Sequence, residues 1–187
     1  MLASLREEVL AISDRQTTIE GMQAFRQAYR RLATATLAPN QTAALRRFYA
    51  DEFLPQLAAK TDSEPVAESY VPAGPAAAYL QYHYIAGNPH PYGRKQELET
   101  AADDASDYGA AHERFHKVFA RVVKIFGFED LMLVDADSLD IVYSYQKTTE
   151  LGTGLEDGPY AGTQMAAKGH GLRGQRDRDD FRIADFE

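Results

Sequence analysis

The chain has 187 residues, of which 44% are hydrophobic and 11% aromatic, enough apolar material for a folded core rather than a disordered chain. Acidic residues (28) outnumber basic ones (20), and the resulting net charge of -8 disfavours nucleic acid as a partner because an acidic protein repels phosphate backbones. The absence of cysteine excludes disulfides, thiolate catalysis and cysteine-ligated metal sites.

The sequence contains no segment that predicts membrane insertion. Its longest apolar runs are only a few residues, and no signal-peptide pattern follows Met1. The basic residues are scattered and form no basic helix face suited to anionic lipid. We therefore expect membrane attachment, if any, only through anchor segments absent from this chain.

Helical periodicity dominates the first two thirds of the sequence. A seam with 3-4-3 spacing near the start consists of Leu2, Leu5, Val9 and Ile12. A short helix with such a seam either packs on its own bundle or pairs with another copy, and a homodimer is the favoured prediction. Further helices are expected from about Thr18, from about Asn40 and from Pro75. Pro55 is expected to kink or end the second of these.

The most regular helical pattern starts at Ala110. Its apolar residues recur at i, i+3, i+4, i+7, i+8 and i+11 and are Phe115, Val118, Phe119, Val122, Val123 and Phe126. Gly127 is expected to end this helix in a left-handed conformation. Before it, two prolines and two glycines within residues 87–93 predict an irregular segment.

The period changes to that of strands after this helix. Residues 131–134 and 141–145 are rich in β-forming side chains, and residues 135–140 predict the hairpin loop between them. Residues 181–186 alternate in the manner of a third strand, which would leave an edge to be covered.

This order of elements predicts an α+β fold. Residues 1–126 form a helix-rich N-terminal part, and residues 127–187 form a partial antiparallel sheet.

Several short sequence blocks follow one another in a fixed order along most of the chain. They are residues 79–82, 86–93, 103–104, 127–135, 141–144, 152–153 and 158–160, together with Tyr108, His112, His116 and Lys147. In this combination they resemble the extracytoplasmic sensor regions of bacterial membrane receptors. Receptors of this kind include methyl-accepting chemotaxis proteins, adenylate cyclases and sensor kinases.

The resemblance implies a signal-input function rather than catalysis, a periplasmic location and a sheet similar to PAS-like Cache domains. Such sheets have five strands, whereas about three are expected here. Two positions depart from the family pattern: Thr148 stands where an acidic residue is usual, and Leu151 where an aromatic residue is usual.

A candidate ligand site follows from the second strand. Alternation along a strand places Tyr143, Tyr145 and Lys147 on one face, and in PAS-like folds one sheet face lines the ligand cavity. A lysine and two phenols suit a small carboxylate, with Tyr160 closing from the following loop. The alternative is an ordinary amphipathic strand whose lysine reaches water. No cofactor and no metal are predicted.

Two other functions remain as alternatives. His112, Glu113 and His116 match the pattern of a zinc hydrolase, in which histidines one helical turn apart share a metal and the glutamate activates water. No further ligand follows at the expected spacing, and the other interpretation is that the two histidines hydrogen-bond to a neighbouring loop. A structural dimerisation module without a ligand is the second alternative.

Overall fold

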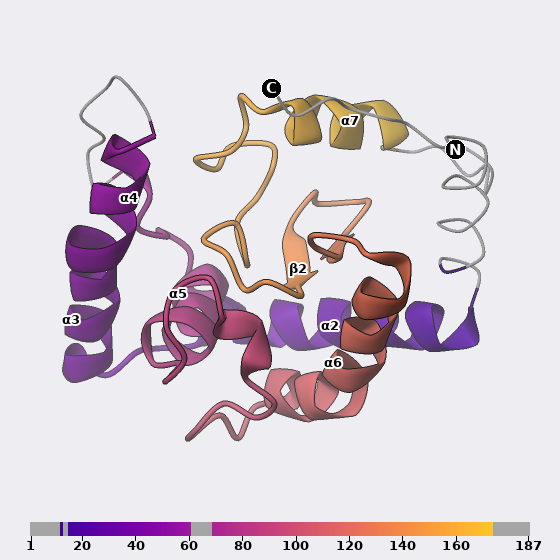
Figure 1. Cartoon of the computed structure of the whole chain (residues 1–187), viewed down its shortest axis with the longest axis horizontal. Coiled ribbons are helices and arrows are strands. Elements are labelled where there is room, and N and C mark those ends of the chain that lie inside the picture. The colour runs from indigo at the N-terminus through magenta and orange to yellow at the C-terminus, as the bar shows by residue number, and fades with distance from the viewer. Residues whose placement is uncertain (1–11, 13–14, 61–68, 174–187) are drawn as a thin grey trace.

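Figure 1 shows a computed structural model of the chain, which describes residue 12, residues 15–60 and residues 69–173. The main elements, in chain order, are α2 (Gln16–Arg31), α3 (Pro39–Phe48), α4 (Leu54–Ala58), α5 (Pro75–Gln81), α6 (Asp107–Phe126), β1 (Met132–Val134), β2 (Ile141–Ser144) and α7 (Gln164–Leu172). Helices precede a small antiparallel sheet, which confirms the predicted α+β class. None of the helices in the described ranges is long and apolar enough to span a bilayer.

The helix predicted from about Asn40 is interrupted near Pro55, as this proline suggests. α3 passes into a π-helical segment, Tyr49–Phe53, and then into α4, in whose first turn Pro55 lies. Proline has no N–H to donate and its ring conflicts with the carbonyl four residues earlier, so the hydrogen-bond ladder widens ahead of it. The expected kink at Pro55 therefore takes the form of a π-helical segment.

α6 is the longest helix and agrees closely with its prediction. Ser106 caps its start, because its hydroxyl accepts hydrogen bonds from two backbone N–H groups of the first turn. Gly127 ends it with a φ of 69°, a left-handed conformation that glycine adopts without a Cβ penalty. The buried face includes Phe115 and Phe119, which pack against α2.

Within the residues that the structure describes, the sheet is a single hairpin of β1 and β2. Leu133 pairs with Tyr143, and the register shifts by one residue between Leu133 and Val134. The third predicted strand, residues 181–186, lies outside the described residues, as do Leu2, Leu5 and Val9 of the N-terminal seam.

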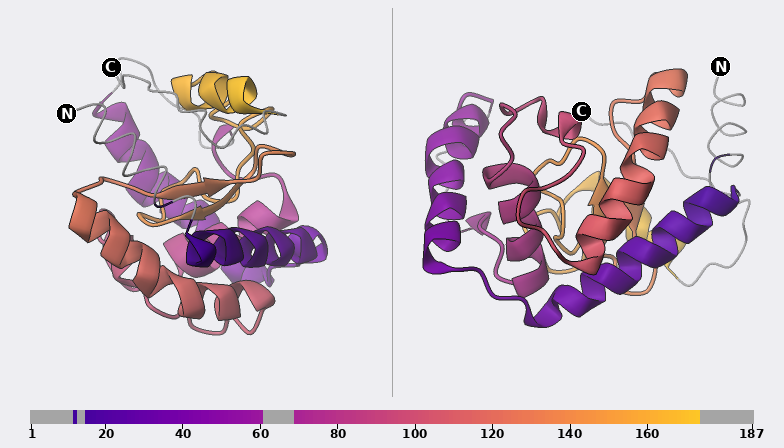
Figure 2. Two further views of the ribbon diagram at one scale, coloured as in Figure 1. Left: turned by 90° about the vertical axis from the view of Figure 1, so that its right-hand side faces the viewer. Right: turned by 90° about the horizontal axis from the view of Figure 1, so that it is seen from below.

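The hairpin lies between helices on both sides. In Figure 2 (left) it forms a middle layer, with α7 on one side and α2 and α6 on the other. Tyr143 belongs to the large core with α2 and α6, whereas Ile141 belongs to a smaller cluster with Ala166 of α7. The expected division after residue 126 therefore does not separate two cores, because helices from before it share a core with the sheet.

α7 was not expected from the sequence. Its nine residues include two glycines and a weak apolar pattern, and Ala166 is its fully buried side chain. Thr163 caps its start by accepting the N–H of Ala166. Its position therefore depends on contacts with the hairpin rather than on local propensity.

The turn after β2 is held against α5. The side-chain amide of Gln81 donates to the carbonyl oxygens of Thr149 (2.7 Å) and Leu151 (3.0 Å). Gly152 adopts a φ of 80°, and a Cβ there would lie 2.8 Å from Cα of Ala77. A side chain at position 152 is excluded both by backbone conformation and by this close approach.

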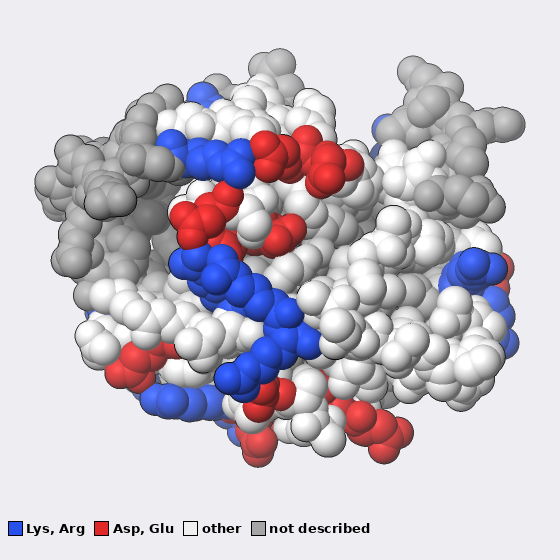
Figure 3. Space-filling view, turned by 180° about the vertical axis from the view of Figure 1, so that it is seen from behind, with Lys and Arg blue, Asp and Glu red and all other residues white. Residues whose placement is uncertain are grey.

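The hairpin tip is held against α2 by ion pairs. The carboxylate of Asp135, which is 2% exposed, lies 2.9 Å from Nε of Arg26 and 3.1 Å from an Nη of Arg30. Asp137 also pairs with Arg26. Figure 3 shows basic and acidic side chains next to one another on this side of the molecule rather than a patch of one sign.

Candidate functional site

Lys147 does not continue the strand as expected. β2 ends at Ser144, and Lys147 has a φ of 56°. The physical reason is Asp130: its carboxylate accepts the backbone N–H of Gln146 (2.9 Å) and the hydroxyl of Ser144 (3.1 Å). An N–H bound to a side chain is not available to extend the ladder, so the chain turns here. The predicted strand alternation is therefore wrong beyond Tyr145.

The structure nevertheless brings three of the four predicted residues together, around His116 of α6. The hydroxyl of Tyr143 lies 2.8 Å from Nδ1 of His116. Nζ of Lys147 lies 3.4 Å from Nδ1 and 3.3 Å from Nε2 of the same ring. The ring of Tyr145 stacks on His116 with 5.8 Å between centroids. The common partner is thus a histidine, not a shared strand face.

The two contacts of His116 determine its tautomer. Nε2 lies 2.9 Å from the carbonyl oxygen of Gln96, which can only accept, so Nε2 carries the proton and donates. Nδ1 then accepts the hydroxyl proton of Tyr143. Burial and the neighbouring Lys147 lower the pKa of His116 to about 4, so this neutral form persists at pH 7.

Lys147 is an unusual lysine because it is 1% exposed and has no ion pair within the described residues. The groups around its Nζ are the His116 ring and the carbonyl oxygen of Tyr145 at 3.4 Å. Burial lowers the pKa of Lys147 to about 7, although the carboxylate of Asp130 opposes this shift. A large share of its amines is therefore neutral at pH 7.

Tyr160, the fourth predicted residue, lies elsewhere. Its hydroxyl is 2.6 Å from Oγ1 of Thr149, and its ring packs against Tyr70 with 6.4 Å between centroids. The chain turns tightly several times between Thr148 and Tyr160, so proximity in sequence does not carry Tyr160 to His116. Within the described residues it makes no contact with Tyr143, Tyr145 or Lys147.

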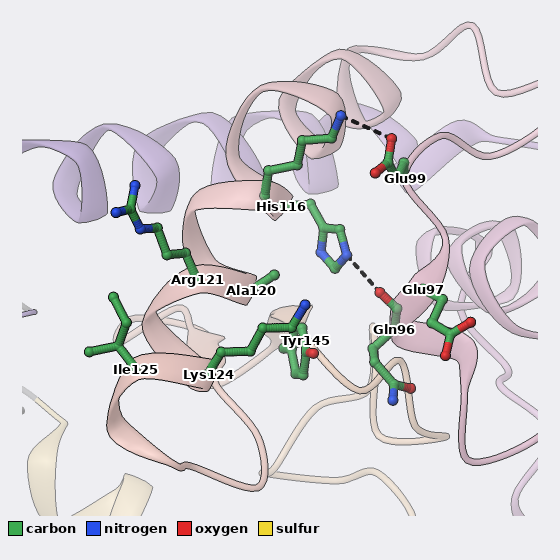
Figure 4. A pocket seen from close by; sticks show the side chains of 10 residues that line it. Gln96, Glu97, Glu99, His116, Ala120, Arg121, Lys124, Ile125 and Tyr145 are labelled. Carbon is green, nitrogen blue, oxygen red and sulfur yellow. Dashed lines mark hydrogen bonds and ion pairs between the residues drawn. The ribbon is translucent and has the colours of Figure 1, made fainter.

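A pocket of about 680 Å³ opens beside this cluster. His116 and Tyr145 form part of its wall, together with α6 and the segment that carries Gln96 (Figure 4). Figure 4 shows the His116 ring directed toward the Gln96 backbone and the Lys124 side chain lying next to Tyr145. Lys147 does not line the pocket, but its amine contacts the ring of His116, which does.

Basic residues are prominent in the pocket lining. Lys117, Arg121 and Lys124 lie at i, i+4 and i+7 along one side of α6. Lys117 pairs with Glu99 at 2.9 Å, whereas Arg121 and Lys124 have no ion pair within the described part of the chain. With Glu97 the lining carries three cations and two carboxylates. The arrangement favours an anionic group at the Arg121 and Lys124 end.

The geometry is not that of a zinc hydrolase. Glu113 is exposed, while His112 and His116 are buried and their rings stack at 4.4 Å. The side chain of Glu113 therefore leaves α6 on a different face from the two histidines. No group of three or more histidine and acidic residues suited to a metal occurs within the described ranges.

The other interpretation of the two histidines is confirmed. Nδ1 of His112 lies 3.1 Å from the carbonyl oxygen of Glu99, and Nε2 of His116 binds that of Gln96. Both histidines thus hydrogen-bond to the loop before α6. Burial lowers the pKa of His112 well below its usual value, and its buried Nε2 has no partner among the described residues.

Sequence reasoning missed the pocket residues of α6 and the role of His116 as the common partner. The expectation that the basic residues are scattered is wrong for α6, because the spacing of Lys117, Arg121 and Lys124 places three cations along one helix face. The position of Gln96 had no such signal, because it depends on how an irregular segment folds against α6.

Comparison of the chain with protein-family models, with curated proteins and with solved structures gave no significant match in any of the three.

Proposed function

We propose that this chain is a ligand-binding input region of a membrane-bound bacterial signalling receptor, and that its ligand is a small carboxylate bound in the α6 pocket. The protein senses rather than catalyses, and acts in the periplasm as part of a homodimer. The receptor class is a proposal from the sequence resemblance. The ligand class is a proposal from the site.

The observation that carries the ligand class is a pocket whose lining includes two cations, Arg121 and Lys124, without an ion pair in the described part of the chain. Arg121 and Lys124 offer charged donors at the pocket surface. Carboxylates form short charge-assisted hydrogen bonds with such donors. At about 680 Å³ the pocket is within the size range of small-molecule sites.

The position of the pocket also supports sensing. His116 and Tyr145 line it, and both contact groups that hold the hairpin to α6. A ligand that shifts either ring alters the packing between β2 and α6. Ligand binding is thereby coupled to the arrangement of two elements, which is what a signal-input region requires.

Calorimetry with a panel of small carboxylates tests the ligand proposal. Acetate, lactate, succinate and 2-hydroxyglutarate should include at least one ligand, and Arg121→Glu or Lys124→Glu should weaken its binding by about tenfold or more. Arg47→Glu makes the same charge change at an exposed position of α3 and should leave affinity unchanged. Equal weakening by all three substitutions, or no binding of any panel member, would contradict the proposal.

Cell fractionation tests the receptor proposal. The native gene product, detected by antibody, should be recovered with the inner membrane, and this region should be cleaved by protease added to spheroplasts. Recovery in the soluble cytosolic fraction would contradict both the receptor assignment and the periplasmic location.

A further inference from the structure

We propose that Lys147 forms a reversible imine with a 2-oxo acid bound in the α6 pocket. This inference rests on the proposed function and specifies its ligand class: the carboxylate is held at the pocket surface, and the adjacent carbonyl carbon is attacked by the lysine amine.

The Lys147 amine lies next to the wall of the α6 pocket. His116 and Tyr145 both line the pocket, and Nζ of Lys147 lies 3.3 Å from Nε2 of His116 and 3.4 Å from the carbonyl oxygen of Tyr145. Lys147 is not itself a lining residue, so imine formation requires the Tyr145 side chain to move out of the pocket wall. Since Lys147 is 1% exposed, reagents outside the pocket do not reach it.

The protonation state of the Lys147 amine also supports imine formation. A lysine attacks a carbonyl only as the neutral amine, and burial without a carboxylate partner favours that form. No ion pair to Lys147 exists within the described ranges, and its neighbours are a neutral imidazole and a carbonyl oxygen. Lys147 thus combines burial with the lack of a carboxylate partner, and both favour a nucleophilic lysine.

Lys95 is a second buried lysine of this chain, and burial lowers its pKa as well. It is 4% exposed, but its Nζ donates a 3.0 Å hydrogen bond to the carbonyl oxygen of Asn88 and lies 5.9 Å from the Phe48 ring centroid. Its amine bonds to a carbonyl oxygen of the loop before α6, whereas the Lys147 amine lies against the His116 ring of the pocket wall. Lys95 is thus a buried lysine in the same chain that serves as an internal control.

The pocket cations select the acid among carbonyl compounds. Arg121 and Lys124 bind the carboxylate, and in a 2-oxo acid the carbonyl carbon is bonded directly to it. Simple aldehydes and ketones lack this anchor. Bound close to the wall, the acid is held at high effective concentration near the amine.

The chemistry is a condensation with no oxidant or reductant. Nζ forms a bond to the carbonyl carbon and gives a carbinolamine; the carbonyl oxygen then leaves as water with the two amine hydrogens. The His116 ring, 3.3 Å from Nζ, and the Tyr143 hydroxyl bound to its Nδ1 are placed to move protons during these steps. Hydrolysis reverses the reaction, as a sensor requires.

Reductive trapping tests the inference. The intact protein is incubated with 2-oxoglutarate and sodium cyanoborohydride, which transfers hydride to the imine carbon, and its peptides are analysed by mass spectrometry. Lys147 should gain the mass of the acid less one oxygen, about tenfold faster than Lys95 or the exposed Lys60. Tyr145→Ala, which removes part of the wall, should accelerate trapping, and Lys147→Arg should abolish it at that site.

A second ligand separates this inference from the proposed function. 2-Hydroxyglutarate has the same carboxylates but cannot form an imine. If it raises the melting temperature and Lys147 is not labelled by 2-oxoglutarate, the imine is ruled out and the carboxylate site stands. If neither acid shifts the melting temperature and Lys147 is labelled no faster than Lys60, both proposals fail. Because the labelling is mapped on unaltered protein, the result does not depend on a variant that folds.

Discussion

Nδ1 of His116 accepts the hydroxyl proton of Tyr143 at 2.8 Å, and this bond is a direct polar link between α6 and β2. Both side chains are buried, with 3% and 0% of their surfaces exposed. Water therefore does not replace either group when the other is removed. Loss of either partner therefore leaves a buried polar group unsatisfied.

Tyr143→Phe should lower the free energy of unfolding by about 1–3 kcal/mol, because it leaves a buried imidazole nitrogen without its donor. Urea unfolding followed by circular dichroism measures this loss. Tyr92→Phe is the matched control: the Tyr92 hydroxyl has no hydrogen bond within the described residues, so its removal should change stability by less than about 0.5 kcal/mol. Equal losses in both variants would contradict the importance assigned to the His116 contact.

Stability should rise with pH above neutrality because of Lys147. The pKa of Lys147 is about 7 in the folded protein and 10.5 when exposed, so between these values the unfolded chain binds the extra proton. Raising the pH from 7 to 9 should therefore add about 2 kcal/mol to the free energy of unfolding, relative to Lys147→Met over the same range. If the free energy of unfolding of the two proteins changes with pH in parallel, the pKa of Lys147 is not lowered by folding and the prediction is wrong.

Stability should fall in mild acid because of His116. Its pKa is about 4 in the folded protein and 6.5 when exposed, so in this window the unfolded chain takes up the proton first. The loss from this group should reach about 3 kcal/mol between pH 6.5 and 4. His116→Gln should flatten this limb of the urea-unfolding profile, whereas His170→Gln, at an exposed position of α7, should leave its slope unchanged.

Gln81→Leu should lower the free energy of unfolding by about 2–4 kcal/mol. The substitution leaves the carbonyl oxygens of Thr149 and Leu151 without their donor in a fully buried site. Gln56→Leu, at an exposed position of α4, is the matched control and should have little effect. Hydrogen exchange should also quicken in residues 149–152 of the Gln81 variant, since the turn loses its attachment to α5.

The fold was predictable where local patterns are strong. α6 has a long apolar period and a terminating glycine, and the hairpin has two β-rich runs around a polar loop, so both are encoded by neighbouring residues. α7 has no such pattern. Its small residues become helical against Leu139 and Leu155 of the hairpin region, which a local pattern does not reveal.

The site was predictable in part for the same reason. The prediction that Tyr143, Tyr145 and Lys147 lie together is correct. They do not share one strand face, however, which was the expected cause. The turn imposed by Asp130 and the common partner His116 are both contributions from residues outside β2. Tyr160 had no independent signal in the residues themselves, and the turns before it carry it to Thr149.

The hairpin is fastened at both of its ends. At its tip Asp135 is held by two arginines of α2, and beyond Ser144 the chain is held by Asp130 and the His116 contacts. Slippage of β2 by one residue would reverse which side chains face each layer and would break attachments at both ends together. The same hairpin thus contacts α6 beside the pocket and α2 at its tip, so a ligand that displaces one end acts on a segment attached to both helices.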